Sequence, residues 1–106
     1  MGARVNYIFD DGSQALTVLY SHWGADSIEA DLEEAFAHAN PRFGDYSYWT
    51  RMVISYLIND ANAVLDETGF GIFAITRDEM NSLDNWGENV IVSCEHATYE
   101  RSEMYV

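Results

Sequence analysis

A change of hydrophobic period within residues 19–29 constrains the fold of this chain more than any other feature. The segment that leads into it alternates apolar and polar residues like a strand, and Gly24 permits the sharp turn that must follow. Asp26 is a typical helix N-cap residue, and Glu29, three positions later, completes a capping-box pattern. The sequence therefore predicts a strand that ends at a glycine and leads directly into a helix.

Two-residue alternation predicts strands on both sides of a tight turn near the start of the chain. Residues 4–9 carry an apolar side chain at every second position, and Asp11 and Gly12 then form a strong hairpin signal. The second strand covers residues 15–21, where Leu19 is apolar on the otherwise polar face, so part of that face should also be covered. Further strands are predicted at residues 70–75, 89–94 and 97–102.

Apolar residues spaced three and four positions apart predict two helices, at residues 27–39 and 46–60. The second helix is apolar over much of its circumference, which is more than one small core can cover. Its extra apolar side chains, Met52, Tyr56 and Ile58, are therefore candidates for an interface with a second copy or another protein.

The element order ββααβββ predicts a single α+β domain over residues 1–106. We expect a mainly antiparallel sheet of four or five strands with both helices packed on one face. No segment approaches the ~18 apolar residues of a membrane span, and no signal-peptide pattern opens the chain, so we expect no membrane association. The single cysteine, Cys94, cannot form an internal disulfide and fits a reducing cytoplasm.

The charge balance says most about possible partners. Eighteen Asp and Glu residues face five Arg residues and no lysine, which gives a net charge of −13. So acidic a domain repels nucleic acids and anionic membranes, and we expect no direct contact with nucleic acid. Three explanations of the charge remain open: solubility, adaptation to salt, and a surface that binds a basic protein.

Carboxylates gather on the first predicted helix. Asp26, Glu29 and Glu33 follow spacings of three and four residues and form a column, to which Asp31 and Glu34 add. Like charges at this spacing repel by about 0.2–0.5 kcal/mol per pair, and the helix dipole favours only those in the first turn. A solvated helix face is the simpler interpretation, and a partner-binding face is the functional one.

No motif identifies a reaction. His22, His38 and His96 lie on different predicted elements without metal-ligand spacing, and no CxxC or glycine-rich phosphate loop occurs. A pairing of Cys94 with His22 would suit nucleophilic catalysis, but a cysteine that ends an apolar strand is usually an inert, packed thiol. We predict no catalytic residue, no metal and no cofactor, and a structural role for His22 and Trp23. A small enzyme that uses the His22 corner remains an alternative.

Three short motifs resemble a family of small uncharacterised proteins of bacteriophages and prophages. They are YSHWG at residues 20–24, YxxR formed by Tyr48 and Arg51, and ETGFGI at residues 67–72. A YSHWG strand-to-helix motif and a late TG[FY]GI segment recur in that family, and the resemblance spans roughly residues 5–95. It implies a phage-borne accessory protein that acts in the host cytoplasm, and it transfers no catalytic residue.

A phage origin would give the acidic helix a specific meaning, because small acidic phage proteins resemble inhibitors of host nucleases, some of which imitate DNA. Helical carboxylates lie about 4.5–6 Å apart along the axis, and a DNA strand carries a charge about every 3.4 Å. We therefore predict an inhibitor of a basic, nucleic-acid-binding host defence complex, of the anti-CRISPR or anti-restriction type. The alternative is an accessory or morphogenesis protein that acts through the second helix, most simply as a homodimer.

Overall fold

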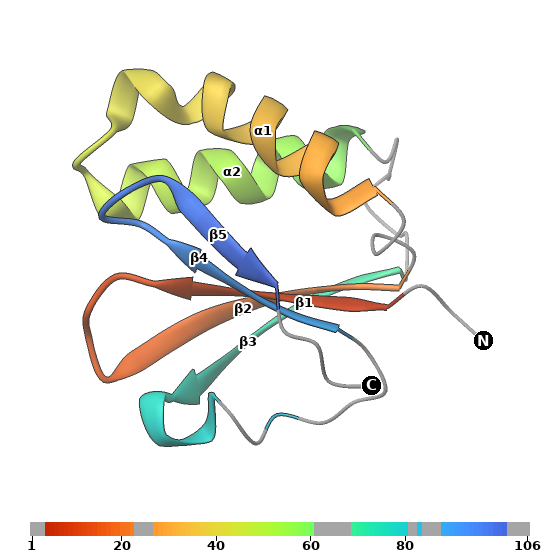
Figure 1. Cartoon of the computed structure of the whole chain (residues 1–106), viewed down its shortest axis with the longest axis vertical. Coiled ribbons are helices and arrows are strands. Elements are labelled where there is room, and N and C mark those ends of the chain that lie inside the picture. The colour runs from red at the N-terminus through yellow and green to blue at the C-terminus, as the bar shows by residue number, and fades with distance from the viewer. Residues whose placement is uncertain (1–3, 23–26, 61–68, 81–82, 84–87, 102–106) are drawn as a thin grey trace.

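The computed structural model describes residues 4–22, 27–60, 69–80, 83 and 88–101. In this part of the chain, a five-stranded sheet carries both α-helices on one face (Figure 1). The α+β class predicted from the sequence is thereby confirmed. The elements in chain order are β1 (Val5–Asp10), β2 (Ala15–Ser21), α1 (Ile28–Ala39), the 3-10 turn η2 (Asn40–Arg42), α2 (Tyr46–Asp60), β3 (Phe70–Thr76), the 3-10 turn η3 (Arg77–Glu79), β4 (Glu88–Ser93) and β5 (Thr98–Arg101).

The strands follow the order β3-β2-β1-β4-β5 across the sheet. The pairs β1–β2, β2–β3 and β4–β5 are antiparallel, whereas the central pair β1–β4 is parallel. The predicted order and mainly antiparallel pairing thus match only in part, because 3-10 turns interrupt the order and the sheet is mixed. A parallel pair requires a long crossover, and the chain between β1 and β4 is long enough because it includes β2, both α-helices and β3.

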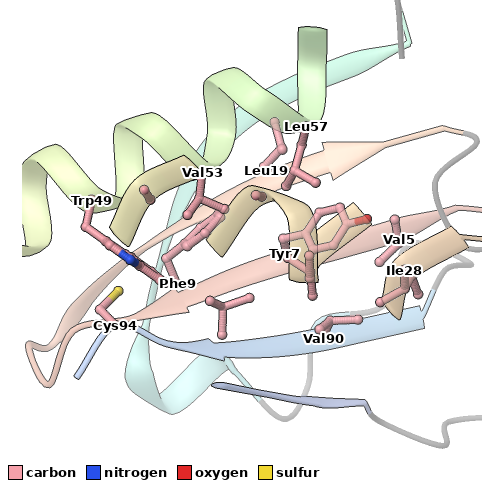
Figure 2. Close-up of a cluster of buried hydrophobic side chains, with 14 residues drawn as sticks. Val5, Tyr7, Phe9, Leu19, Ile28, Trp49, Val53, Leu57, Val90 and Cys94 are labelled. Atoms are coloured by element: carbon pink, nitrogen blue, oxygen red, sulfur yellow. The ribbon is translucent and has the colours of Figure 1, made fainter. Parts of the chain in front are cut away.

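The main core lies between the sheet and the helices, and Figure 2 shows its side chains. Alternate residues of β1 point into it, as the two-residue period predicts, and a stripe of each helix packs against them. Its largest buried members are Trp49, Tyr7, Leu19, Ile28, Leu32, Val5, Val53, Val90 and Val92. The helices are therefore fixed to the sheet by apolar burial.

A second, smaller core covers part of the opposite face of the sheet. It is formed by Ile8, Leu16, Val18 and Ile75, with Met80 and Leu83 packed against it. Buried Asn6 donates a hydrogen bond to Asn89 (2.8 Å), and Asn89 in turn donates to the carbonyl of Leu83 (2.9 Å), so these polar groups are satisfied. Strands β1 and β2 are therefore buried on both faces.

The start of α1 differs from the prediction. Residues 23–26, which include the predicted N-cap, lie outside the described part of the chain, and the structure places Ser27 at the N-cap and Ile28 at the first helical position. The residue three positions after Ser27 is Ala30, so Glu29 cannot complete a capping box. A capping box occurs instead at η3, where Glu79 accepts the backbone N–H of Thr76 (2.8 Å).

Candidate functional site

A groove of about 490 Å³ lies on the helix side of the sheet, between α2 and strands β1, β2 and β3. It is open to solvent at β3, where Ile72 is 61% exposed. Its lining combines an apolar floor with a few polar groups: Phe9, Asp11, Thr17, Tyr46, Ser47, Thr50, Arg51, Ile54, Ile72 and Cys94.

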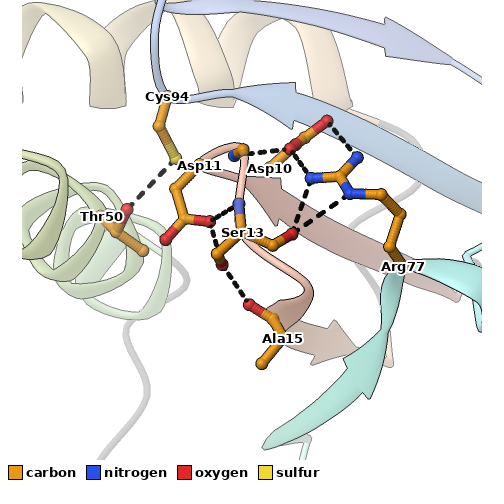
Figure 3. A network of polar contacts seen from close by, with 8 residues as sticks. Asp10, Asp11, Ser13, Ala15, Thr50, Arg77 and Cys94 are labelled. Carbon is orange, nitrogen blue, oxygen red and sulfur yellow. Dashed lines mark hydrogen bonds and ion pairs between the residues drawn. The ribbon is translucent and has the colours of Figure 1, made fainter.

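The thiol of Cys94 lines this groove, with its Sγ 3.4 Å from the Thr50 hydroxyl (Figure 3). Burial raises the pKa of the Cys94 thiol, and the neighbouring carboxylates of Asp11 and Asp10 raise it further, although the contact with Thr50 lowers it. A thiol held in its protonated form lacks the thiolate that nucleophilic catalysis requires. The surroundings of Cys94 are those of a packed cysteine.

His22 lies at the other end of the sheet from Cys94. Its ring Nδ1 is 2.8 Å from the Tyr20 hydroxyl, and its backbone N–H donates to the carbonyl of Gly69 (2.8 Å). Cys94 follows the far end of β4, so the length of a strand, roughly 20 Å, separates the two side chains. The pairing of Cys94 with His22 considered from the sequence is therefore wrong.

Arg77 connects the β1–β2 turn to the end of β3 (Figure 3). Its guanidinium donates to both carboxylate oxygens of Asp10 (2.6 and 3.3 Å) and to the carbonyl of Ser13 (2.8 and 3.2 Å). Asp10 also accepts the backbone N–H of Gly12 (2.9 Å). The hydrogen bond from Arg77 lowers the pKa of Asp10, and so does the Gly12 N–H, while burial opposes them.

We expect Asp10→Asn to destabilise the protein at neutral pH and to have little effect in acid. Because folding lowers the pKa of Asp10, the ionised carboxylate stabilises the fold at pH values above its ordinary pKa of 3.8. This contribution is lost as the pH falls through the lower pKa of the folded protein. Urea denaturation of both proteins from neutral pH to about pH 3 measures the difference. A difference that stays constant over this range would show that the carboxylate charge does not hold the turn.

The structure separates the five carboxylates predicted as a partner-binding column. Asp26 lies outside the described residues. Glu29, Glu33 and Glu34 are exposed on the solvent side of α1, and we call these three the α1 acidic face. Asp31 is half-buried and accepts a hydrogen bond from the N-cap side chain (2.7 Å), so it belongs to the start of the helix.

Arg101 of β5 lies beside one end of the α1 acidic face. Its Nη1 is 3.5 Å from Glu29, while Nε and Nη2 donate to the buried carboxylate of Glu88 at 2.6 and 2.9 Å. The two-pronged contact with Glu88 is the stronger one, because it is shorter and largely removed from water. Arg101 therefore neutralises the negative charge of Glu29 only in part.

The remaining two carboxylates of this face have different surroundings. Glu34 accepts a hydrogen bond from the Tyr56 hydroxyl of α2, whereas the described residues provide no cation for Glu33. Partial burial raises the pKa of Tyr99 on β5, and the carboxylates of Glu29 and Glu33 raise it further.

The three interface candidates on α2 are half-buried and pack against the main core. The ring of Tyr56 stacks on His38 of α1 (4.4 Å between centroids), so this part of α2 contacts α1. Arg51, of the YxxR motif, donates to Ser55 (3.2 Å). Met52 and Ile58 are half-buried, as Tyr56 is. Among the described residues, the large hydrophobic side chains that are exposed are Phe43, Tyr48, Ile72 and Phe73.

Ile72 and Phe73 are the residues that sequence reasoning missed. Their uncharged segment, FGIFAI, predicts a buried strand, and nothing local indicates that this strand ends the sheet. The absence of charge was the available signal, because it leaves a possible sheet edge unprotected.

No protein-family model matches this chain, and comparisons with curated proteins and with solved structures give no match. None of the helices in the described ranges is long and apolar enough to cross a membrane. Within the same ranges, no three His, Cys, Asp or Glu side chains are grouped so that they could hold a metal ion.

Proposed function

We propose that this protein is an inhibitor of the anti-CRISPR or anti-restriction type. It binds a basic, nucleic-acid-binding protein of a host defence complex through the α1 acidic face. The observation that supports this function is the exposure of Glu29, Glu33 and Glu34 on one helix of a chain with net charge −13 and no lysine. The resemblance to phage proteins agrees with the same function.

The geometry of α1 suits a cationic groove. Glu29 and Glu33 are one turn apart, which places their Cα atoms about 6 Å apart along the axis, compared with about 3.4 Å of axis between the charges of a DNA strand. The exposed residues between and beyond them include Ala30 and Ala37, whose small side chains allow a partner to approach closely. Mutual repulsion between Glu29 and Glu33 costs about 0.2–0.5 kcal/mol, and the described residues provide no cation that offsets the charge of Glu33.

The alternative functions have weaker support. An accessory or morphogenesis protein acting through α2 would need open apolar surface, but Met52, Tyr56 and Ile58 pack within the fold. An enzyme at the His22 corner would need a second reactive group, and Cys94 lies at the opposite end of the sheet.

The test compares two triple charge reversals with the wild type. Glu29→Lys/Glu33→Lys/Glu34→Lys changes the α1 acidic face, and the matched control reverses three exposed carboxylates on other elements: Asp78, Glu95 and Glu100. Each substitution replaces a negative charge by a positive one and so changes the net charge by two units, which gives the two variants the same net charge. All three proteins, immobilised, are exposed to a bacterial lysate, and the retained proteins are identified by mass spectrometry.

We expect the wild type and the control variant to retain nucleic-acid-binding proteins, and the α1 variant to lose them. With a purified retained protein, the α1 variant should associate about tenfold more slowly or worse, because steering by charge is lost. Folding should be preserved, since exposed ion pairs contribute about 0–1 kcal/mol. Equal retention by both variants would mean that net charge alone acts and that the α1 acidic face is only a solvated surface.

A further inference from the structure

We infer that two copies of this chain associate through the outer edge of β3, which forms an antiparallel pair with the partner's β3 about a two-fold axis at Ile72. This inference does not depend on the proposed function. Strand β3 ends the order of the sheet, and none of the other described strands pairs with its outer side (Figure 1). A row of unpaired backbone groups is a template for another strand.

Strand β3 lacks the features that protect natural sheet edges. It contains no charged residue and no proline, and Ile72 and Phe73 are 61% and 38% exposed on opposite faces. The other edge, β5, is shorter and carries Glu100 and Arg101. Because β3 is uncharged in a chain of net charge −13, a second copy of the same strand can approach it without opposing carboxylates.

The ladder with β2 determines which backbone groups of β3 point outward. His22 donates to the carbonyl of Gly69, and Arg77 donates to that of Gln14, both at 2.8 Å, in the same register as the strand pairs. Because hydrogen-bonded pairs alternate along an antiparallel ladder, every second residue of β3 bonds to β2. The residues whose N–H and C=O point outward are Phe70, Ile72, Ala74 and Thr76.

Glu79 removes one member of this outward set, because its carboxylate accepts the backbone N–H of Thr76 (2.8 Å). The three remaining residues are centred on Ile72. A two-fold axis there pairs Ile72 with the partner's Ile72, and Phe70 with the partner's Ala74. This register uses every outward backbone group from Phe70 to Ala74.

The side chains fit this register, with large residues opposite small ones. Phe73 lies opposite the partner's Gly71, in a pair without hydrogen bonds whose Cα atoms approach to about 4.5 Å. A Cβ at Gly71 would meet no atom within 4 Å, and its φ is not positive, so neither crowding nor conformation requires glycine within one chain. Glycine weakens a strand, but a partner's aromatic ring can cover the space beside it.

Salt separates this association from the proposed function. Two chains of net charge −13 repel each other, so screening should strengthen the dimer, whereas it should weaken binding of a basic partner to the α1 acidic face. The two proposals can therefore fail separately.

Sedimentation equilibrium at low salt and at about 0.5 M salt tests the dimer. The protein concentration should reach about 0.5 mM, because a single strand pair buries less surface than a standard interface and should bind weakly. The mass of the wild type should rise from 12.0 kDa towards twice that value with concentration, and more steeply at high salt. Ile72→Lys should remain monomeric, although the added lysine reduces the net negative charge and therefore the repulsion between copies. Ile72→Val, and Thr98→Lys on the other edge strand, should associate like the wild type.

Amide hydrogen exchange tests the register without any substitution. The amides of Phe70, Ile72 and Ala74 should become protected as concentration rises, while those of Gly71, Phe73 and Ile75 are protected at every concentration. A wild type that stays at 12.0 kDa under all conditions would overturn the inference. So would an Ile72→Lys variant that associates like the wild type, since the contact would then lie elsewhere.

Discussion

Replacing Trp49 with alanine should lower the free energy of unfolding by about 3–5 kcal/mol. Trp49 of α2 is 1% exposed and lies in the main core (Figure 2). Its ring stacks on Phe36 of α1 at 5.3 Å between centroids, so it joins the two helices. Domains of this size are stable by about 5–15 kcal/mol, so the variant should lose much of its margin. Urea denaturation followed by circular dichroism measures the change.

Trp49→Phe is the matched control. The indole N–H of Trp49 is buried without a hydrogen-bond partner among the described residues, and an unpaired buried donor costs about 1–3 kcal/mol. Phenylalanine removes this donor and keeps a ring against Phe36, so we expect a loss below about 1.5 kcal/mol. Equal losses in both variants would contradict the role assigned to the stacked ring.

Replacing Arg101 with alanine should cost about 3 kcal/mol, because it leaves the carboxylate of Glu88 buried without its counter-charge. The value lies at the low end for a broken buried pair, since the Arg101 side chain is 39% exposed while that of Glu88 is 5% exposed. Thermal and urea denaturation at neutral pH measure the loss.

Two comparisons test this assignment. Glu29→Ala removes only the exposed contact of Arg101 and should change stability by about 0–1 kcal/mol. The double variant Glu88→Leu/Arg101→Leu removes both charges and should be more stable than Arg101→Ala. If Arg101→Ala and Glu29→Ala had the same small effect, the buried pair would not hold β5 to β4.

Local chemistry explains which parts of the fold could be predicted. The bounds of α2 follow from its spacing of apolar residues, and the alternation of Val5, Tyr7 and Phe9 identifies the buried side of β1. The parallel neighbour of β1 could not be predicted, because strand order depends on contacts between distant segments. The start of α1 was misplaced since Asp26 and Ser27 are both good N-cap residues.

In the candidate site, too, features set by the local sequence could be predicted and contacts between distant segments could not. Helical spacing places Glu29 and Glu33 together, but no local pattern reveals that Arg101 or Tyr56 lies beside this helix. The exposed edge of β3 was missed for a related reason. Its apolar run is typical of a buried strand, and only the complete sheet shows that one side has no neighbour.

Competition with duplex DNA tests the central claim most directly. A protein retained on the immobilised wild type is challenged with increasing duplex DNA at constant ionic strength, and its release is measured. If the α1 acidic face occupies a nucleic-acid-binding groove, DNA should release the retained protein completely, since DNA and the α1 acidic face would bind the same cationic side chains of that groove. Retention that is unchanged by saturating DNA would contradict the account.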